Sequence, residues 1–286
     1  MKVFYCTTAK NFGDVLNGWM WNELIPDLLV QDDPLILCGI GSILGDAFVA
    51  PDGLRVVMGS GFGYGNPLKL DDSWNIRFVR GPITAKALGI DPALALTDAA
   101  IFLPGLITAP PPSPTGQAAF MPHFLQHRYS GEDLQPLIES LGWKYLDPTR
   151  PFMELIHDIR ACSRLYASAM HGVIVADLFR IPWVPVFHNK AIYNVKWHDW
   201  AQSMEVPLNI HRVYHSGSVI SRRGAVRRLD YACVKAQFQM VKWRARPMLS
   251  SDAVLLDRQQ RALDAIALLR QDYPRLLEQA ASRRKR

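Results

Sequence analysis

A histidine at the turn between a strand and a helix is the strongest candidate for chemistry in this sequence. Apolar residues 165–167 lead into Ser168, and His171 with Gly172 then opens a periodic apolar stretch that predicts a helix. The first N–H groups of a helix have no intrahelical partner and carry partial positive charge, so this turn suits an anion. His171 could there act as general acid or base. The alternative is that His171 has no role in chemistry and that its ring donates a hydrogen bond to a neighbouring carbonyl.

An arginine stands at the end of another predicted strand. Arg80 follows the apolar run 76–79, and Pro82 after it suits the first turn of a helix. A guanidinium offers a planar fork of donors that matches a carboxylate or a phosphate, so we expect Arg80 on the ligand-binding face. The alternative is a salt bridge to a loop carboxylate, Asp71 or Asp72.

Small polar residues follow the first predicted strand, residues 2–6. The loop contains Asn11, Gly13 and Asp14, and the helix after it, predicted to begin at Val15, contains Asn17. Between a strand and a helix, such residues can bind an anion or sugar hydroxyls. The alternative is that Asp14 caps the helix and Gly13 serves the turn.

Two more buried strands, 34–38 and 54–58, each run into a glycine-rich loop. Gly41 and Ser42 lie in the first loop and Gly61 in the second, which suggests backbone packed against a ligand. The second loop does not match the dinucleotide fingerprint, and the chain has no phosphate-loop motif. We therefore expect no nicotinamide, flavin or ATP cofactor.

Two further cationic side chains are candidates for binding an anionic ligand. His123 lies in a predicted loop, residues 122–128, after the strand 118–121. Lys196 lies in the aromatic and basic stretch 188–200, which suits either a sugar-binding face or the core and rim of a last helix. The histidine spacing does not match a zinc motif, so we expect no metal site.

Strand and helix patterns alternate along most of the 286 residues, which predicts an α/β fold. A stiff proline-rich segment interrupts the alternation, so we expect two Rossmann-like parallel-sheet domains that face a cleft. We expect a first domain at residues 1–107, a linker at 108–117, a second domain at 118–211 and a basic helical tail at 212–286.

The basic character of the chain is confined to the tail. Residues 1–211 hold 15 Lys and Arg against 20 Asp and Glu, whereas residues 212–286 hold 17 against 6. This division argues against nucleic acid as a partner. In the tail, an amphipathic helix is expected from about Asp252 to Leu269, and residues 234–246 combine an apolar and aromatic stripe with basic residues, which suits an anionic membrane surface. The alternative is a helix that packs on the protein with a solvated basic face.

The cysteines and the apolar runs predict the compartment. The four cysteines have no C-x-x-C spacing and mostly lie in apolar surroundings, which is typical of free thiols in a reducing compartment. The sequence contains no long uncharged apolar run. We expect a cytoplasmic protein, peripheral on the inner face of the membrane.

Five segments, in unbroken order over roughly residues 1–200, together resemble the polysaccharide pyruvyltransferase family. The similarity is closest to its succinoglycan-type exopolysaccharide ketal pyruvyltransferases. The resemblance implies a two-domain fold similar to type-B glycosyltransferases. The segments are Asn11–Asp14 with Leu16–Asn17, Gly39–Ile43, Val79–Pro82 with Thr84–Ala85, Met121–His123, and Ala169–Gly172 through Ala176–Asp177 to Ile181–Val184.

The same resemblance implies phosphoenolpyruvate as donor and a sugar of a lipid-linked repeat unit as acceptor. The product is then a pyruvate ketal across two hydroxyls, with release of phosphate. Much of the family has the order Arg-Leu-His where this chain has Ala169, Met170 and His171. The arginine is therefore replaced here by Ala169. The positive charge that binds the donor must then come from Arg80, His123 or Lys196. We expect His171 and Arg80 to be catalytic.

Two other functions compete with this interpretation. One is a nucleotide-sugar glycosyltransferase of the same architecture, which would bind a sugar nucleotide and release no phosphate from phosphoenolpyruvate. The other is a non-catalytic, membrane-docked assembly protein, in which Arg80 and His171 could be replaced freely.

Overall fold

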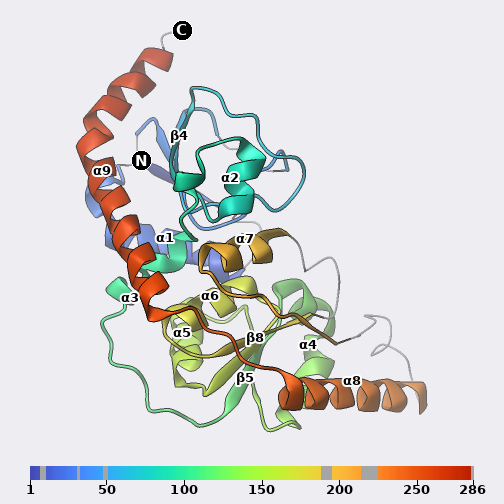
Figure 1. Ribbon diagram of the computed structural model, residues 1–286. Helices are drawn as coiled ribbons and strands as arrows, with labels where there is room; N and C mark the ends of the chain where they lie inside the picture. Colours follow the sequence, from blue (N-terminus) through green and yellow to red (C-terminus); the bar gives the residue numbers. More distant parts are fainter. Residues whose placement is uncertain (7–10, 31–32, 48–50, 188–194, 214–224, 285–286) are drawn as a thin grey trace.

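Two parallel β-sheets with helices around them form the protein, as Figure 1 shows. The computed structural model describes residues 1–6, 11–30, 33–47, 51–187, 195–213 and 225–284. The expected α/β fold with two parallel, Rossmann-like sheets is confirmed.

The first sheet is built from the apolar runs of the N-terminal half. Its order is β1-β2-β3-β4, all parallel, and β2 is buried along its whole length. Strands buried on both faces suit a parallel sheet that helices cover. The strands are β1 (Lys2–Phe4), β2 (Leu35–Cys38), β3 (Leu54–Met58) and β4 (Trp74–Phe78).

The second sheet has the order β6-β5-β7-β8-β9 and is also parallel. The β7–α6–β8 unit holds the histidine turn, as the sequence predicts. The proline-rich segment precedes β5 and so connects the two halves. The strands are β5 (Ala118–Met121), β6 (Lys144–Tyr145), β7 (Arg164–Ala167), β8 (Trp183–Phe187) and β9 (His211–Arg212).

Helices cover the sheets and link them. The α-helices are α1 (Phe12–Leu24), α2 (Pro82–Leu88), α3 (Leu103–Leu106), α4 (Phe124–Glu139), α5 (Phe152–Ala161), α6 (Met170–Leu178), α7 (Val195–Ser203), α8 (Ala225–Arg244) and α9 (Asp252–Arg284). The described residues also form three short 3-10 helices, η1 (Pro26–Leu28), η2 (Pro92–Leu94) and η3 (Ala99–Phe102).

A continuous apolar core joins the two halves. It includes side chains of both sheets together with α1, α5, α6 and α9. A further cluster lies on the second sheet, where Phe120 and Trp143 pack against Phe238 of α8. The basic tail is thus divided between the halves, since α8 packs on the second sheet and α9 returns to the first (Figure 1).

Two helices extend beyond the predicted limits. Helix α4 begins at Phe124, inside the predicted loop 122–128, because the His123 side chain accepts a hydrogen bond from the Leu125 amide and caps the helix. Helix α9 continues past Pro274 to Arg284, whereas the apolar pattern predicts its end near Leu269. No described helix is long and apolar enough to cross a bilayer.

Candidate active site

A pocket of about 430 Å³ is lined by loops that follow strands of both sheets. Such loops at the carboxyl ends of parallel strands form the usual ligand site of open α/β sheets. The lining combines a few polar groups with an apolar wall. Its residues are Cys6, Asn11, Phe12, Asp14, Gly41, Ser42, Ile43, Ala47, Tyr64, His123, Phe124, Leu125, Pro148, Ala169, Met170, His171 and Lys196.

His171 lies in the first turn of α6, directly after β7, and its ring is 11% exposed. The turn brings the ring against Gly13 of α1, where an added Cβ would overlap the ring. Glycine at position 13 therefore permits the close approach of α1 to α6. The ring Nε2 lies 3.6 Å from the buried Asp98 Oδ2.

Asp14 is a half-buried carboxylate in the first turn of α1, which begins at Phe12 rather than at the predicted Val15. Burial raises the pKa of Asp14 above its ordinary value, although His171, an Asn11 hydrogen bond and Lys196 act in the opposite direction. The Asn11 Nδ2 donates to Asp14 Oδ2 at 2.9 Å. The pocket thus holds a carboxyl group that retains its proton to a higher pH than an exposed one.

Lys196 and His123 reach the pocket from the second half. The Lys196 Nζ at the start of α7 donates to the Tyr64 hydroxyl of the first half at 2.9 Å. The amide of His123 donates to Ser168 Oγ at 2.7 Å, which fixes the turn after β5. Both side chains line the pocket, as the sequence predicts for a ligand-binding position.

Arg80 takes a position other than the expected one, because its guanidinium is buried behind the pocket wall. The Nε donates to Asp199 Oδ2 at 3.1 Å, the Nη1 to Ser42 Oγ at 2.8 Å, and the Nη2 to the Phe62 carbonyl at 2.6 Å. The salt bridge is therefore formed, but with α7 rather than with Asp71 or Asp72. Arg80 holds Ser42, which does line the pocket.

The other predicted site residues support the pocket from outside it. The Asn17 side chain bonds both the amide and the carbonyl of Ile40, at 2.8 and 2.9 Å, and so fixes the loop after β2. Ser168 Oγ donates to Gln126 Oε1 at 2.6 Å. An added Cβ at Gly61 would overlap Arg80, and one at Gly172 would approach the Met121 sulfur. These residues shape the loops without lining the pocket.

The sequence did not reveal two parts of the site. Asp98 is sequentially remote from His171, and only its place before two alanines marks it as a helix cap. The apolar wall was also missed, because Phe12, Phe124 and Met170 share no spacing with one another in the chain.

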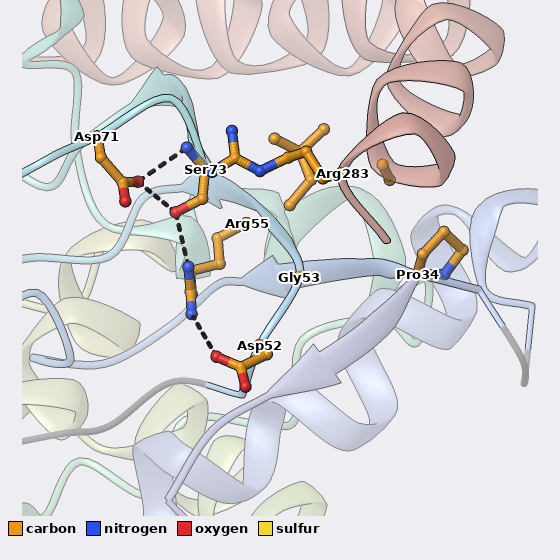
Figure 2. Close-up of a pocket in the computed structure, with 9 residues that line it drawn as sticks. Pro34, Asp52, Gly53, Arg55, Asp71, Ser73 and Arg283 are labelled. Atoms are coloured by element: carbon orange, nitrogen blue, oxygen red, sulfur yellow. Dashed lines mark hydrogen bonds and ion pairs between the residues drawn. The ribbon is translucent and has the colours of Figure 1, made fainter. Parts of the chain in front are cut away.

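A second pocket, of about 440 Å³, lies at the other end of the strands of the first sheet (Figure 2). Figure 2 shows Arg55 between Ser73 and Asp52, with Arg283 of α9 nearby. The Arg55 Nη1 donates to Ser73 Oγ at 2.7 Å, so these two polar side chains of the second pocket bind each other. This pocket lies at the amino-terminal ends of β3 and β4, away from the loops that suit a ligand.

Acid–base chemistry on an anionic ligand is what the first pocket can support. It places an imidazole, a carboxyl group with a raised pKa and a lysine on one partly apolar cavity. Within the described residues, no three His, Cys, Asp or Glu side chains are grouped so that they could hold a metal ion.

Comparisons with known proteins agree with this chemistry. Residues 32–189 match a family described as polysaccharide pyruvyl transferase. The chain is also 36% identical over 217 residues to the succinoglycan biosynthesis protein ExoV of Rhizobium meliloti (strain 1021). The aligned region covers 74% of this chain and 68% of that protein. The family match includes the pocket segments that follow β2, β5 and β7.

Proposed function

This chain belongs to the polysaccharide pyruvyl transferase family and is a polysaccharide pyruvyltransferase of exopolysaccharide synthesis, and we propose that its donor is phosphoenolpyruvate. The acceptor is a sugar in a lipid-linked repeat unit, and the products are a pyruvate ketal across two of its hydroxyls and free phosphate. The observation that carries this proposal is the pocket on which His171, Asp14 and Lys196 converge from α6, α1 and α7.

The donor carries a carboxylate and a phosphate on a small frame, so its site must supply positive potential. Lys196 lines the pocket as a cation, residues of the first turn of the nine-residue helix α6 line it too, and His123, whose Nδ1 accepts the Leu125 amide, offers a neutral ring. In this proposal Lys196 and the first turn of α6 replace the arginine that position 169 lacks. Arg80 contributes by positioning Ser42 and α7 rather than by contact with the donor.

The reaction requires two protons to be added and two to be removed. A proton is added to C3 of the enol, which makes C2 electrophilic. One sugar hydroxyl then attacks C2, the bond from C2 to the phosphate oxygen breaks, and a second hydroxyl completes the ketal. The two hydroxyl protons balance the one gained by C3 and the one gained by phosphate.

We assign two of these proton transfers to side chains of the pocket. His171 takes up the proton of an attacking hydroxyl, since it lies at the anion-binding end of α6. Asp14 delivers the proton to C3, which its raised pKa favours because the neutral acid persists to higher pH. The apolar wall around them limits competition from water.

We place the reaction at the cytoplasmic face of the membrane, because α8 presents a suitable surface. Its Val234, Phe238 and Val241 are buried, while Met240 is 51% and Trp243 91% exposed on the outer side. Exposed Ala232, Cys233 and Ala236 extend this apolar stripe, and exposed Arg244 flanks it, whereas the Lys242 Nζ donates to the Leu141 carbonyl at 3.1 Å. Each cation near an anionic leaflet contributes about 1 kcal/mol, and the aromatic ring suits the interface.

The test of the donor is incubation of the purified protein with phosphoenolpyruvate and a glycoside whose 4- and 6-hydroxyls are free, or with a lipid-linked oligosaccharide. We expect phosphate release and a product heavier by one pyruvyl ketal. Phosphate release that does not depend on the acceptor, or a glycosylated product from a sugar nucleotide, would refute the proposal. Retention of full activity by the His171→Ala variant would refute the role of His171.

A further inference from the structure

We propose that Asp98 is the positioning residue of His171. Its carboxylate receives the Nε2 proton of the ring, fixes the tautomer that leaves Nδ1 free as a base, and stabilises the imidazolium formed when Nδ1 takes up a proton. The assignment of a base to His171 rests on the proposed function. The pairing of the two side chains rests on geometry alone.

The carboxylate of Asp98 is held at one oxygen and left unsatisfied at the other. Asp98 precedes η3, and its Oδ1 accepts a hydrogen bond from the Ala100 amide at 3.0 Å. The second oxygen, Oδ2, is buried, and among the described residues it has no hydrogen-bond partner. An unsatisfied buried acceptor is costly, so a donor is expected opposite this oxygen.

The group opposite is the one ring nitrogen of His171 that is also buried and unsatisfied. The Nε2 has no hydrogen-bond partner among the described residues and lies 3.6 Å from Asp98 Oδ2. This separation exceeds a hydrogen bond. Catalytic hydrogen bonds are often long before substrate binds and tighten in the complex.

The surroundings leave the ring little freedom to choose another partner. Because Gly13 of α1 has no side chain, no Cβ covers the Nδ1 side of the ring, and Asp98 lies beyond Nε2. The other charged groups near the ring are Asp14 of α1 and Lys196 of α7, both on the pocket. In hydrolases a buried carboxylate on one ring nitrogen likewise orients a histidine base, although there the carboxylate holds Nδ1 and the base is Nε2.

The alternative is that Asp98 only caps η3, and the chain offers a matched control for it. Asp91 caps η2 in the same way, since its Oδ1 accepts from the Ala93 amide at 2.9 Å. Unlike Asp98, it is exposed. Asp98→Asn and Asp91→Asn both retain an oxygen for the cap, but only the first removes the charge behind His171.

The first experiment is nitrogen-15 NMR of the histidine rings in the wild-type protein, with His171 assigned through the His171→Gln variant. We expect the neutral ring to carry its proton on Nε2 in the wild type and in Asp91→Asn, and to lose this preference in Asp98→Asn. A wild-type ring protonated on Nδ1 would overturn the proposal. This measurement requires no substrate and no stable variant at position 98.

The second experiment measures kcat and KM for phosphate release from phosphoenolpyruvate across pH. We expect Asp98→Asn to lower kcat by about 10²–10⁴-fold, to leave KM within a few-fold, and to change the shape of the pH profile. Unchanged kcat with an unchanged tautomer would make Asp98 a cap alone. If the wild type releases no phosphate, the proposed function fails, whereas the tautomer still decides the role of Asp98.

Discussion

Arg80 and Asp199 form a fully buried ion pair, with 3.1 Å between Nε and Oδ2, that joins the loop after β4 to α7. Asp199 also accepts from the Thr84 amide and hydroxyl, at 2.9 and 2.6 Å. The pair therefore fixes α7, which carries Lys196, relative to the first sheet. Arg80 acts on the pocket through this connection.

Replacing Arg80 should first of all lower stability. Arg80→Ala leaves Asp199 buried without its counter-charge, which is expected to cost about 3–5 kcal/mol in the free energy of unfolding. Urea unfolding measures this loss. Arg275→Ala, which removes an exposed pair with Asp272, should cost less than about 1 kcal/mol. An Arg80→Ala variant of unchanged stability that no longer binds phosphoenolpyruvate would instead place the guanidinium on the donor.

His171→Ala should lower turnover without unfolding the protein. We expect a fall in kcat of about 10²–10⁴-fold, which is typical of a lost acid–base group, in an assay of phosphate release. His157→Ala is the matched control, because that side chain is 66% exposed on α5, and its kcat should equal that of the wild type. Wild-type turnover in His171→Ala would remove the ring from the chemistry.

Asp14→Asn should stabilise the protein at neutral pH. Because burial raises the folded-state pKa of Asp14, the folded protein keeps this proton at pH values where the unfolded chain has lost it. The free energy of unfolding therefore falls as pH rises from the ordinary carboxyl pKa towards the raised one. Urea unfolding between about pH 4 and pH 8 should show a smaller fall in Asp14→Asn. An equal fall in both proteins would contradict the raised pKa.

The local elements were predictable because they depend on neighbouring residues. Strands 54–58 and 118–121 have the predicted bounds, and Gly89 ends α2 in the left-handed conformation, with φ 65°. The partners of the site residues were not predictable. Arg80 meets a carboxylate 119 positions away, and the contact of Gly13 with His171 forms only when both halves pack together.

The tail illustrates the same limit. Its helical pattern was clear, but the sequence could not specify that Phe238 of α8 packs on the second sheet whereas α9 contacts β2, β3, β4 and η3 of the first half. Both helices are amphipathic, so the apolar pattern alone does not say which sheet each one covers. The choice of sheet depends on tertiary contacts.

The outer face of α8 should bind anionic vesicles. We expect the wild type to sediment with phosphatidylglycerol-containing vesicles and not with phosphatidylcholine alone, and to be released by salt. Trp243→Ser should weaken this binding. Leu263→Ser, which replaces a 49% exposed residue of α9, should not. If Trp243→Ser instead abolishes a dimer seen by analytical ultracentrifugation, this face joins two copies of the chain.

Helix α9 should be essential to the stability of the first half. Leu269 is fully buried, whereas its neighbour Leu268 is 54% exposed, so the two positions separate burial from helix propensity. Leu269→Ala should cost about 2–5 kcal/mol through lost contacts and a cavity. Leu268→Ala should change stability by less than about 0.5 kcal/mol. Urea unfolding of both variants measures this difference, and equal effects would mean that α9 is not packed against the first sheet in solution.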